Sequence, residues 1–180
     1  MVFVPIVVFA IAAFAVPFLM HRHAIRLLRE FARRAGWEDG EYDWLMSTME
    51  SRWNRVPVSF WRVRNRSRLR LERPSAVTLH MTRKSDALAW LNDAFRADVI
   101  EIEPSVFRFH GDAVELARAL NSNDEIAFAM HEVPYGGAEL IIDREGITVT
   151  ARSYWNETPD AAWRLILAVD RLLTPERRAL

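Results

Sequence analysis

The first twenty residues constrain this chain more than any other stretch. Val2 to Met20 contains only Val, Phe, Pro, Ile, Ala, Leu and Met, with no charged or polar side chain. At the rise of an α-helix this run spans about 28 Å, close to the hydrocarbon thickness of a bilayer. We therefore expect a transmembrane anchor over residues 1–21, with the lipid bilayer contacted through residues 2–20.

Two other interpretations of the apolar segment stay open. One is a cleaved signal peptide, because Ala13-Phe14-Ala15 has the small residues of a cleavage site, although no Lys or Arg precedes the apolar run. The other is a helix buried in the core of a domain. Whether the segment is cleaved is not decided by its composition.

Basic residues follow the apolar segment directly, and Gly36 is placed to end the amphipathic helix that carries them. They are Arg22, Arg26, Arg29, Arg33 and Arg34. The positive-inside rule then predicts a single-pass membrane protein with its N-terminus outside and its domain in the cytoplasm; if the cell is Gram-negative, the membrane is the inner one. These arginines are interpreted either as an ordinary juxtamembrane flank or as contacts to anionic headgroups.

Composition excludes several classes of site and shows an uneven distribution of charge. The 180 residues include no Cys, which rules out disulfides, thiolate metal sites and cysteine nucleophiles. The net charge is zero, yet residues 1–84 carry 15 Lys and Arg against 7 Asp and Glu, and residues 85–180 carry 9 against 17. Such asymmetry indicates two surfaces for different partners or one half of the chain lying against the other.

The second informative stretch is rich in arginine. Every even position from 62 to 70 is basic: Arg62, Arg64, Arg66, Arg68 and Arg70. Alternation with a period of two is typical of a β-strand, and Asn65-Arg66-Ser67 predicts the turn of a hairpin. We expect one face of this hairpin to bury four apolar residues and the other to carry all the arginines. The predicted buried residues are Trp61, Val63, Leu69 and Leu71.

An all-arginine face has three interpretations. It can be a solvated face, a face paired with the acidic half of the chain, or a surface for a polyanion. Nucleic acid would need aromatic side chains among the arginines, and only Phe60 has the matching parity. Lipid headgroups are therefore preferred to nucleic acid as the anionic partner, and the five arginines are the candidate binding residues.

The remaining segments alternate between helices and hairpins. Tyr42 to Trp53 places Trp44, Met49 and Trp53 at helical intervals, which gives a helical juxtamembrane segment over residues 22–55. Residues 56–175 then form one cytoplasmic domain. Within it, strands are expected at 76–81, 99–101, 106–109, 140–142 and 147–149, and helices at 85–95, 113–120, 124–131 and from Pro159 to the residue before Pro175. Hairpins packed with helices, without long βαβ crossovers, indicate an α+β fold.

The layout resembles one family of proteins. The order SRWNRVPVSF, a basic hairpin, VFRFHGDAVELARAL, AELIIDREGITVTA and a closing helix is similar to uncharacterised bacterial single-pass membrane-anchored α+β domains of unknown function. The resemblance covers most of residues 21–175 and implies no functional residues.

No catalytic signature is present in the sequence. Phosphate-binding glycine loops, HExxH, GxSxG and calcium loops are all absent, so we predict no cofactor and no metal site. His110, Asp112 and His131 are the side chains that a fold could bring together for acid–base chemistry, but capping of helices also explains them.

These observations favour a membrane-tethered interaction or accessory protein with an unidentified protein partner, and no enzymatic activity. An anionic-surface binder acting through the arginine-rich hairpin is the first alternative, and a hydrolase using His110, Asp112 or His131 is the second. Nucleic acid is not expected as a partner.

Overall fold

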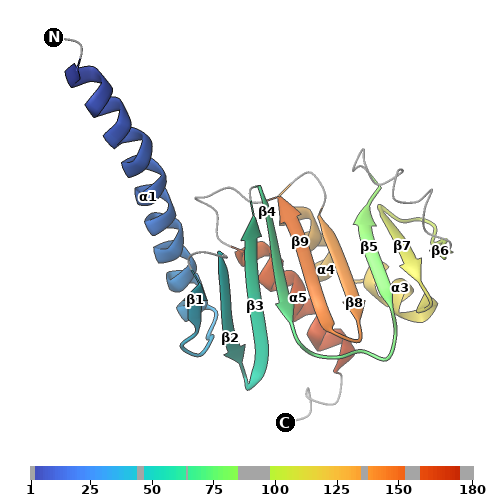
Figure 1. Ribbon diagram of the computed structural model, residues 1–180. Coiled ribbons are helices and arrows are strands. Elements are labelled where there is room, and N and C mark those ends of the chain that lie inside the picture. The colour runs from blue at the N-terminus through green and yellow to red at the C-terminus, as the bar shows by residue number, and fades with distance from the viewer. Residues whose placement is uncertain are drawn as a thin grey trace.

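The computed structural model describes residues 3–43, 47–63, 65–84, 98–134, 138–152 and 159–174, with the backbone alone for residues 3–14. Its centre is an antiparallel sheet of nine strands in the order β1-β2-β3-β4-β9-β8-β5-β7-β6 (Figure 1). The strands are β1 (Glu41–Asp43), β2 (Thr48–Trp53), β3 (Val56–Val63), β4 (Arg66–Leu71), β5 (Leu79–Arg83), β6 (Val99–Ile100), β7 (Phe107–Gly111), β8 (Glu139–Asp143) and β9 (Gly146–Arg152). The described helices are α1 (Phe3–Arg34), α3 (Val114–Asn121), α4 (Asp124–Glu132) and α5 (Asp160–Leu173).

The core lies between one face of the sheet and the helices, of which α3, α4 and α5 lie behind the sheet in Figure 1 and α1 lies beside it. Strand residues alternate between this inner face and the outer face, as the period of a strand requires. Leu140 and Ile142 of β8 are buried, for example, and their neighbour Ile141 is partly exposed on the outer face. Helix α5 covers the middle of the inner face with an apolar stripe that includes Leu165, Ile166 and Val169.

Helix α1 is continuous from Phe3 to Arg34, and Pro17 lies within it. Its C-terminal half buries Leu28 and Phe31 against the domain. Edge-to-face aromatic contacts continue from Phe31 through Trp37 to Trp163 of α5, with ring centroids 5.3 Å apart at each step. The second half of the helix is therefore part of the core.

None of the helices in the described part of the chain is long and apolar enough to cross a membrane. The predicted transmembrane anchor, the single-pass topology and the cytoplasmic placement that depended on it are therefore wrong. The prediction treated the apolar run and the basic segment after it as two separate elements. In the structure the two are one helix, which carries charge along its C-terminal half and packs on the sheet.

The predicted fold class is corrected accordingly. A nine-stranded antiparallel sheet with four described helices replaces a transmembrane helix followed by a domain of hairpins and helices. The helical periodicity assigned to Tyr42–Trp53 is also wrong, because β1 and β2 lie there and pair with each other. Met49 and Trp53 are four positions apart, a spacing that puts two residues on the same face of a helix and also on the same face of a strand. Pairing of Tyr42 with Met49 on the inner face decides between the two.

The second half of the chain follows the predicted order more closely. The hairpin β8–β9 and helices α3, α4 and α5 lie where the sequence placed them. Asn123 caps α4 by accepting a hydrogen bond from the backbone N–H of Ile126 at 3.1 Å. The helix expected at residues 85–95 lies outside the described residues.

A buried ion pair joins the sheet to α5. The Arg73 guanidinium, in the connection after β4, lies 3.0 Å from the carboxylate of Asp170 in α5, and both side chains are largely buried. Arg83 at the end of β5 donates to the backbone carbonyls of Met130 and Val133 at the C-terminal end of α4. Both arginines thus hold a helix against the inner face.

Candidate functional site

The arginine-rich hairpin forms, but with a different register from the one predicted. In the pair β3–β4, Val63 lies opposite Arg66 and Phe60 lies opposite Leu69. The prediction had placed Val63 and Leu69 on the same face, with the turn around Asn65-Arg66-Ser67. Because the pairing moves by an odd number of residues, the side chains of β3 exchange faces relative to those of β4.

The exchange of faces reverses the environment of the aromatic residues. Phe60 is 2% exposed in the core, whereas Trp61 and Val63 are 39% and 42% exposed on the outer face. Leu69 and Leu71 are buried, as predicted. The prediction that Trp61 and Val63 are buried is wrong, and it failed because Val58 and Phe60 fill the inner face of β3 instead.

The five candidate arginines do not share one face. Arg62 is only 8% exposed on the inner face, and its guanidinium carbon lies 5.2 Å from the centroid of the Phe60 ring, a cation–π geometry. Arg66 and Arg68 point outward and are exposed. Arg64 lies outside the described residues.

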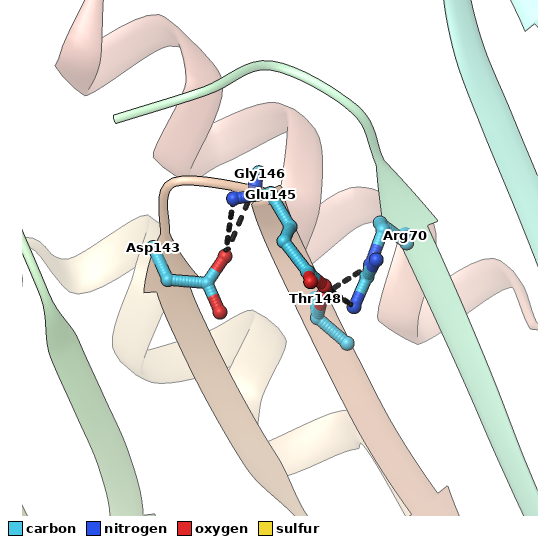
Figure 2. Close-up of polar contacts among 5 residues, drawn as sticks. All are labelled: Arg70, Asp143, Glu145, Gly146 and Thr148. Atoms are coloured by element: carbon cyan, nitrogen blue, oxygen red, sulfur yellow. Dashed lines mark hydrogen bonds and ion pairs between the residues drawn. The ribbon is translucent and has the colours of Figure 1, made fainter. Parts of the chain in front are cut away.

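Arg70 is held by the neighbouring hairpin (Figure 2). Its Nε donates to Thr148 Oγ1 at 3.1 Å, and its guanidinium lies 2.6 Å from the Glu145 carboxylate. In the same turn, Asp143 accepts hydrogen bonds from the N–H groups of Glu145 and Gly146 at 2.8 and 3.1 Å (Figure 2). Arg70 therefore joins β4 to the β8–β9 turn and is not placed like Arg66 and Arg68.

The outward side chains near this end of the hairpin form one surface, which we call the hairpin patch. Its members are Trp61, Val63, Arg66, Arg68 and Arg152. Trp61 lies directly across from Arg68, and Arg66 lies directly across from Arg152 of β9. The side chains of the three arginines make no hydrogen bond or ion pair with any described residue. Two like charges directly opposite each other destabilise a sheet, so the pair of Arg66 and Arg152 is unfavourable for the fold.

The basic residues of α1 lie in its C-terminal half. Arg22, Arg29 and Arg33 are exposed. Arg26 pairs with Glu30 at 3.7 Å, and Arg34 lies 3.4 Å from the carboxylate of Asp160. Both pairs are exposed, which makes each of them weak. The five residues thus form a cationic flank whose members differ in how far they are neutralised.

Tyr42 connects α1 with the hairpin. Its ring contacts that of His21, with centroids 6.3 Å apart. Burial raises the pKa of the Tyr42 hydroxyl above its ordinary value of 10.0, and a hydrogen bond with Ser47 and the charge of Arg62 act in the opposite direction. The contact fixes the position of α1 beside β1.

The structure does not bring the three candidate catalytic side chains into one site. His110 lies on the outer face of β7, with its ring centroid 6.0 Å from that of His80. His131 belongs to α4, which packs on the inner face. Asp112 accepts a hydrogen bond from the N–H of Thr78 at 2.9 Å and does not cap α3. The described residues contain no cluster of three His, Asp or Glu side chains that could hold a metal ion.

A surface hollow of about 620 Å³ lies between α4 and the adjacent ends of β5 and β7. Its lining residues are Arg83, Lys84, Ser105, Val106, Phe107, Ala127, Phe128 and His131. Val106 and Phe128 are 69% and 66% exposed, among the most exposed large apolar side chains described. Among the described residues, this lining contains no carboxylate.

No family model matches the chain, and no curated protein matches it. Among solved structures, the chain is similar to the crystal structure of the mycobacterial trehalose monomycolate transport factor A, TtfA. The TM-score is 0.50 at 11% sequence identity, and the similarity covers 89% of this chain and 96% of that one. At this identity the likeness shows a shared fold.

Sequence reasoning missed three features of these surfaces. The exposure of Trp61 could have been inferred from Phe60, since one of the two neighbours must face outward in a strand. Arg152 joins the patch through pairing with a strand more than 80 positions earlier, and nothing local signals that pairing. Phe128 lies on the short helix α4, whose buried face is filled by Ile126, Ala129 and Met130, so Phe128 is left on the exposed side.

Proposed function

We propose that this chain is an accessory protein of a transport process and that it acts by binding a protein partner. The observation that supports this is the likeness to a transport factor over nearly the full length of both chains. An accessory role is also compatible with the separation of His110, Asp112 and His131 in the described structure.

The hollow beside α4 is the surface that we assign to the protein partner. Exposed aromatic and aliphatic side chains in a concave site are typical of the centre of a protein interface. Phe128 and Val106 supply such side chains, and Phe107 beside them is buried. A partner side chain of apolar character would bury against all three.

Charge complementarity further defines the partner segment. Lys84 lies at the lining of the hollow and is exposed, and the lining residues that the structure describes include no Asp or Glu. An acidic residue beside the apolar anchor would therefore find a cation within reach. The expected occupant is a short protein segment in which an apolar side chain is flanked by Asp or Glu.

Crosslinking of the intact chain in cells tests this proposal. The double variant Phe128→Ser with Val106→Ser removes the apolar lining, and Val99→Ser with Val114→Ser, at two exposed apolar residues outside this lining, is the matched control. We expect one partner to be recovered by the wild type and by the control, and about tenfold less by the Phe128 variant.

The transport role and the assignment of the hollow are contradicted by different results. If both variants recover the partner equally, the hollow is not the surface that binds it. The transport role itself requires that the captured partner belongs to a transport system and that cells lacking the chain retain its cargo where it is made. Normal distribution of that cargo would overturn the role, whatever the variants bind.

A further inference from the structure

The hairpin patch differs from an ordinary charged surface because cations and apolar side chains lie on it together. Trp61 and Val63 alternate with arginines across the β3–β4 pair, and both are more than a third exposed. The cross-strand neighbours of Arg66 and Arg68 are Val63, Trp61, Arg152 and Thr150, none of which is acidic. The patch thus presents three positive charges around an aromatic centre.

A second apolar surface lies at the same end of the molecule. Helix α1 extends past the sheet at the end where β3 finishes and β4 begins (Figure 1). The exposed apolar side chains of this part of α1 are Val16, Phe18, Leu19 and Met20. Arg22 lies on the next turn and is exposed. Two separate elements therefore expose both apolar and basic side chains.

We propose that the hairpin patch docks on the surface of a bilayer that contains anionic phospholipids, with Arg66, Arg68 and Arg152 on headgroup phosphates and Trp61 at the level of the headgroups. Trp is enriched at membrane interfaces because its ring is apolar and its N–H is polar. Arginine binds phosphate through several N–H donors at once. The contact is with the surface of the bilayer and is independent of the protein partner proposed above.

The aliphatic residues distinguish lipid from nucleic acid. A single-stranded nucleic acid would use arginines for its phosphates and Trp61 for stacking, but it offers nothing to Val63 or Leu19. A lipid surface accepts all of these side chains, since the acyl boundary lies a few ångströms below the phosphates. The observed combination of side chains therefore favours lipid.

Vesicle binding by the intact chain tests the proposal. The probes are vesicles of phosphatidylcholine alone and of phosphatidylcholine with 30% phosphatidylglycerol. We expect Arg66→Gln, Arg68→Gln and Arg152→Gln to lower partition onto the anionic vesicles about fivefold each, on the order of 100-fold together, and to leave binding to neutral vesicles unchanged. The matched control removes the same charge from the helix side: Arg118→Gln, Arg164→Gln and Arg171→Gln, each of which lies on an exposed ion pair. We expect this control to bind anionic vesicles as the wild type does.

The absence of Cys provides a readout of position. Val63→Cys, labelled with a polarity-sensitive fluorophore, should shift to the blue on anionic vesicles, and the same label at Phe128→Cys on the opposite layer should not. Equal loss of binding in the patch variant and the control variant would overturn the proposal, and so would an unchanged label at position 63 in the bound protein. Arginine-dependent binding of a single-stranded oligonucleotide, with vesicle binding independent of the arginines, would assign the patch to nucleic acid instead.

Discussion

Two neighbouring hairpins of the sheet differ in what determines their register. In β8–β9 the turn itself is specific: Asp143 accepts two backbone hydrogen bonds, and Gly146 has a φ of +133° that other residues rarely adopt. In β3–β4 the alternation of arginine with other residues fits more than one pairing. There the inner face of β3 decides, because Val58 and Phe60 enter the core.

The comparison shows why one hairpin was predictable and the other was not. A turn whose conformation only a few residue types can adopt sets the register of the two strands that it joins. An alternating basic strand leaves the pairing to packing against distant elements, among them α5 and β9. The less constrained hairpin is also the one that carries exposed Trp and Arg, so that its outer face is available for binding.

The largest expected effect separates the two registers of β3–β4. Phe60→Ala should lower the free energy of unfolding by about 3–5 kcal/mol, because it leaves a cavity in the core. Trp61→Ala should lower it by about 1 kcal/mol or less, since the ring is partly solvated. Urea denaturation of both variants measures the difference. The reverse order of the two losses would mean that Trp61 is the buried residue.

A substitution in the turn of β8–β9 should lower the free energy of unfolding by nearly as much. Gly146→Ala places a Cβ about 2.1 Å from the carbonyl oxygen of Leu71 in a strained backbone conformation, and should cost about 3 kcal/mol. Gly36→Ala is the matched control: its φ is also positive, but nothing lies within 4 Å of the added carbon. It should cost about 1 kcal/mol. Equal thermal unfolding of the two variants would contradict the close approach of Leu71.

The smallest effect distinguishes two arginines of one strand. Arg70→Gln loses the contacts to Thr148 and Glu145 and should cost about 1 kcal/mol, since Glu145 is largely exposed and screened. Arg68→Gln should change stability by less than about 0.5 kcal/mol. Salt should reduce the Arg70 effect and leave the Arg68 variant unaffected. An Arg68 loss as large as that of Arg70 would mean that Arg68 has a folded-state partner.

Local signals predicted local structure, and long-range pairing escaped them. The β8–β9 turn, the cap at Asn123 and the apolar stripe of α5 can all be inferred from neighbouring residues. The nine-stranded order cannot, because β4 pairs with β9 and β5 pairs with β8 across long stretches of chain. The candidate site needed both kinds of information. The five arginines were visible in the sequence, but only the register shows that Arg62 is buried and Arg70 is held.

The strand order also has a consequence for how the protein is made. The last hairpin, β8–β9, lies between β4 and β5 and completes the sheet. Until residues 139–152 leave the ribosome, both β4 and β5 have an unpaired edge, and the two halves of the sheet have no shared strand. Exposed edges of this kind favour pairing with other chains. The nascent chain is therefore exposed to such pairing at both β4 and β5 until residues 139–152 have emerged and taken their place between them.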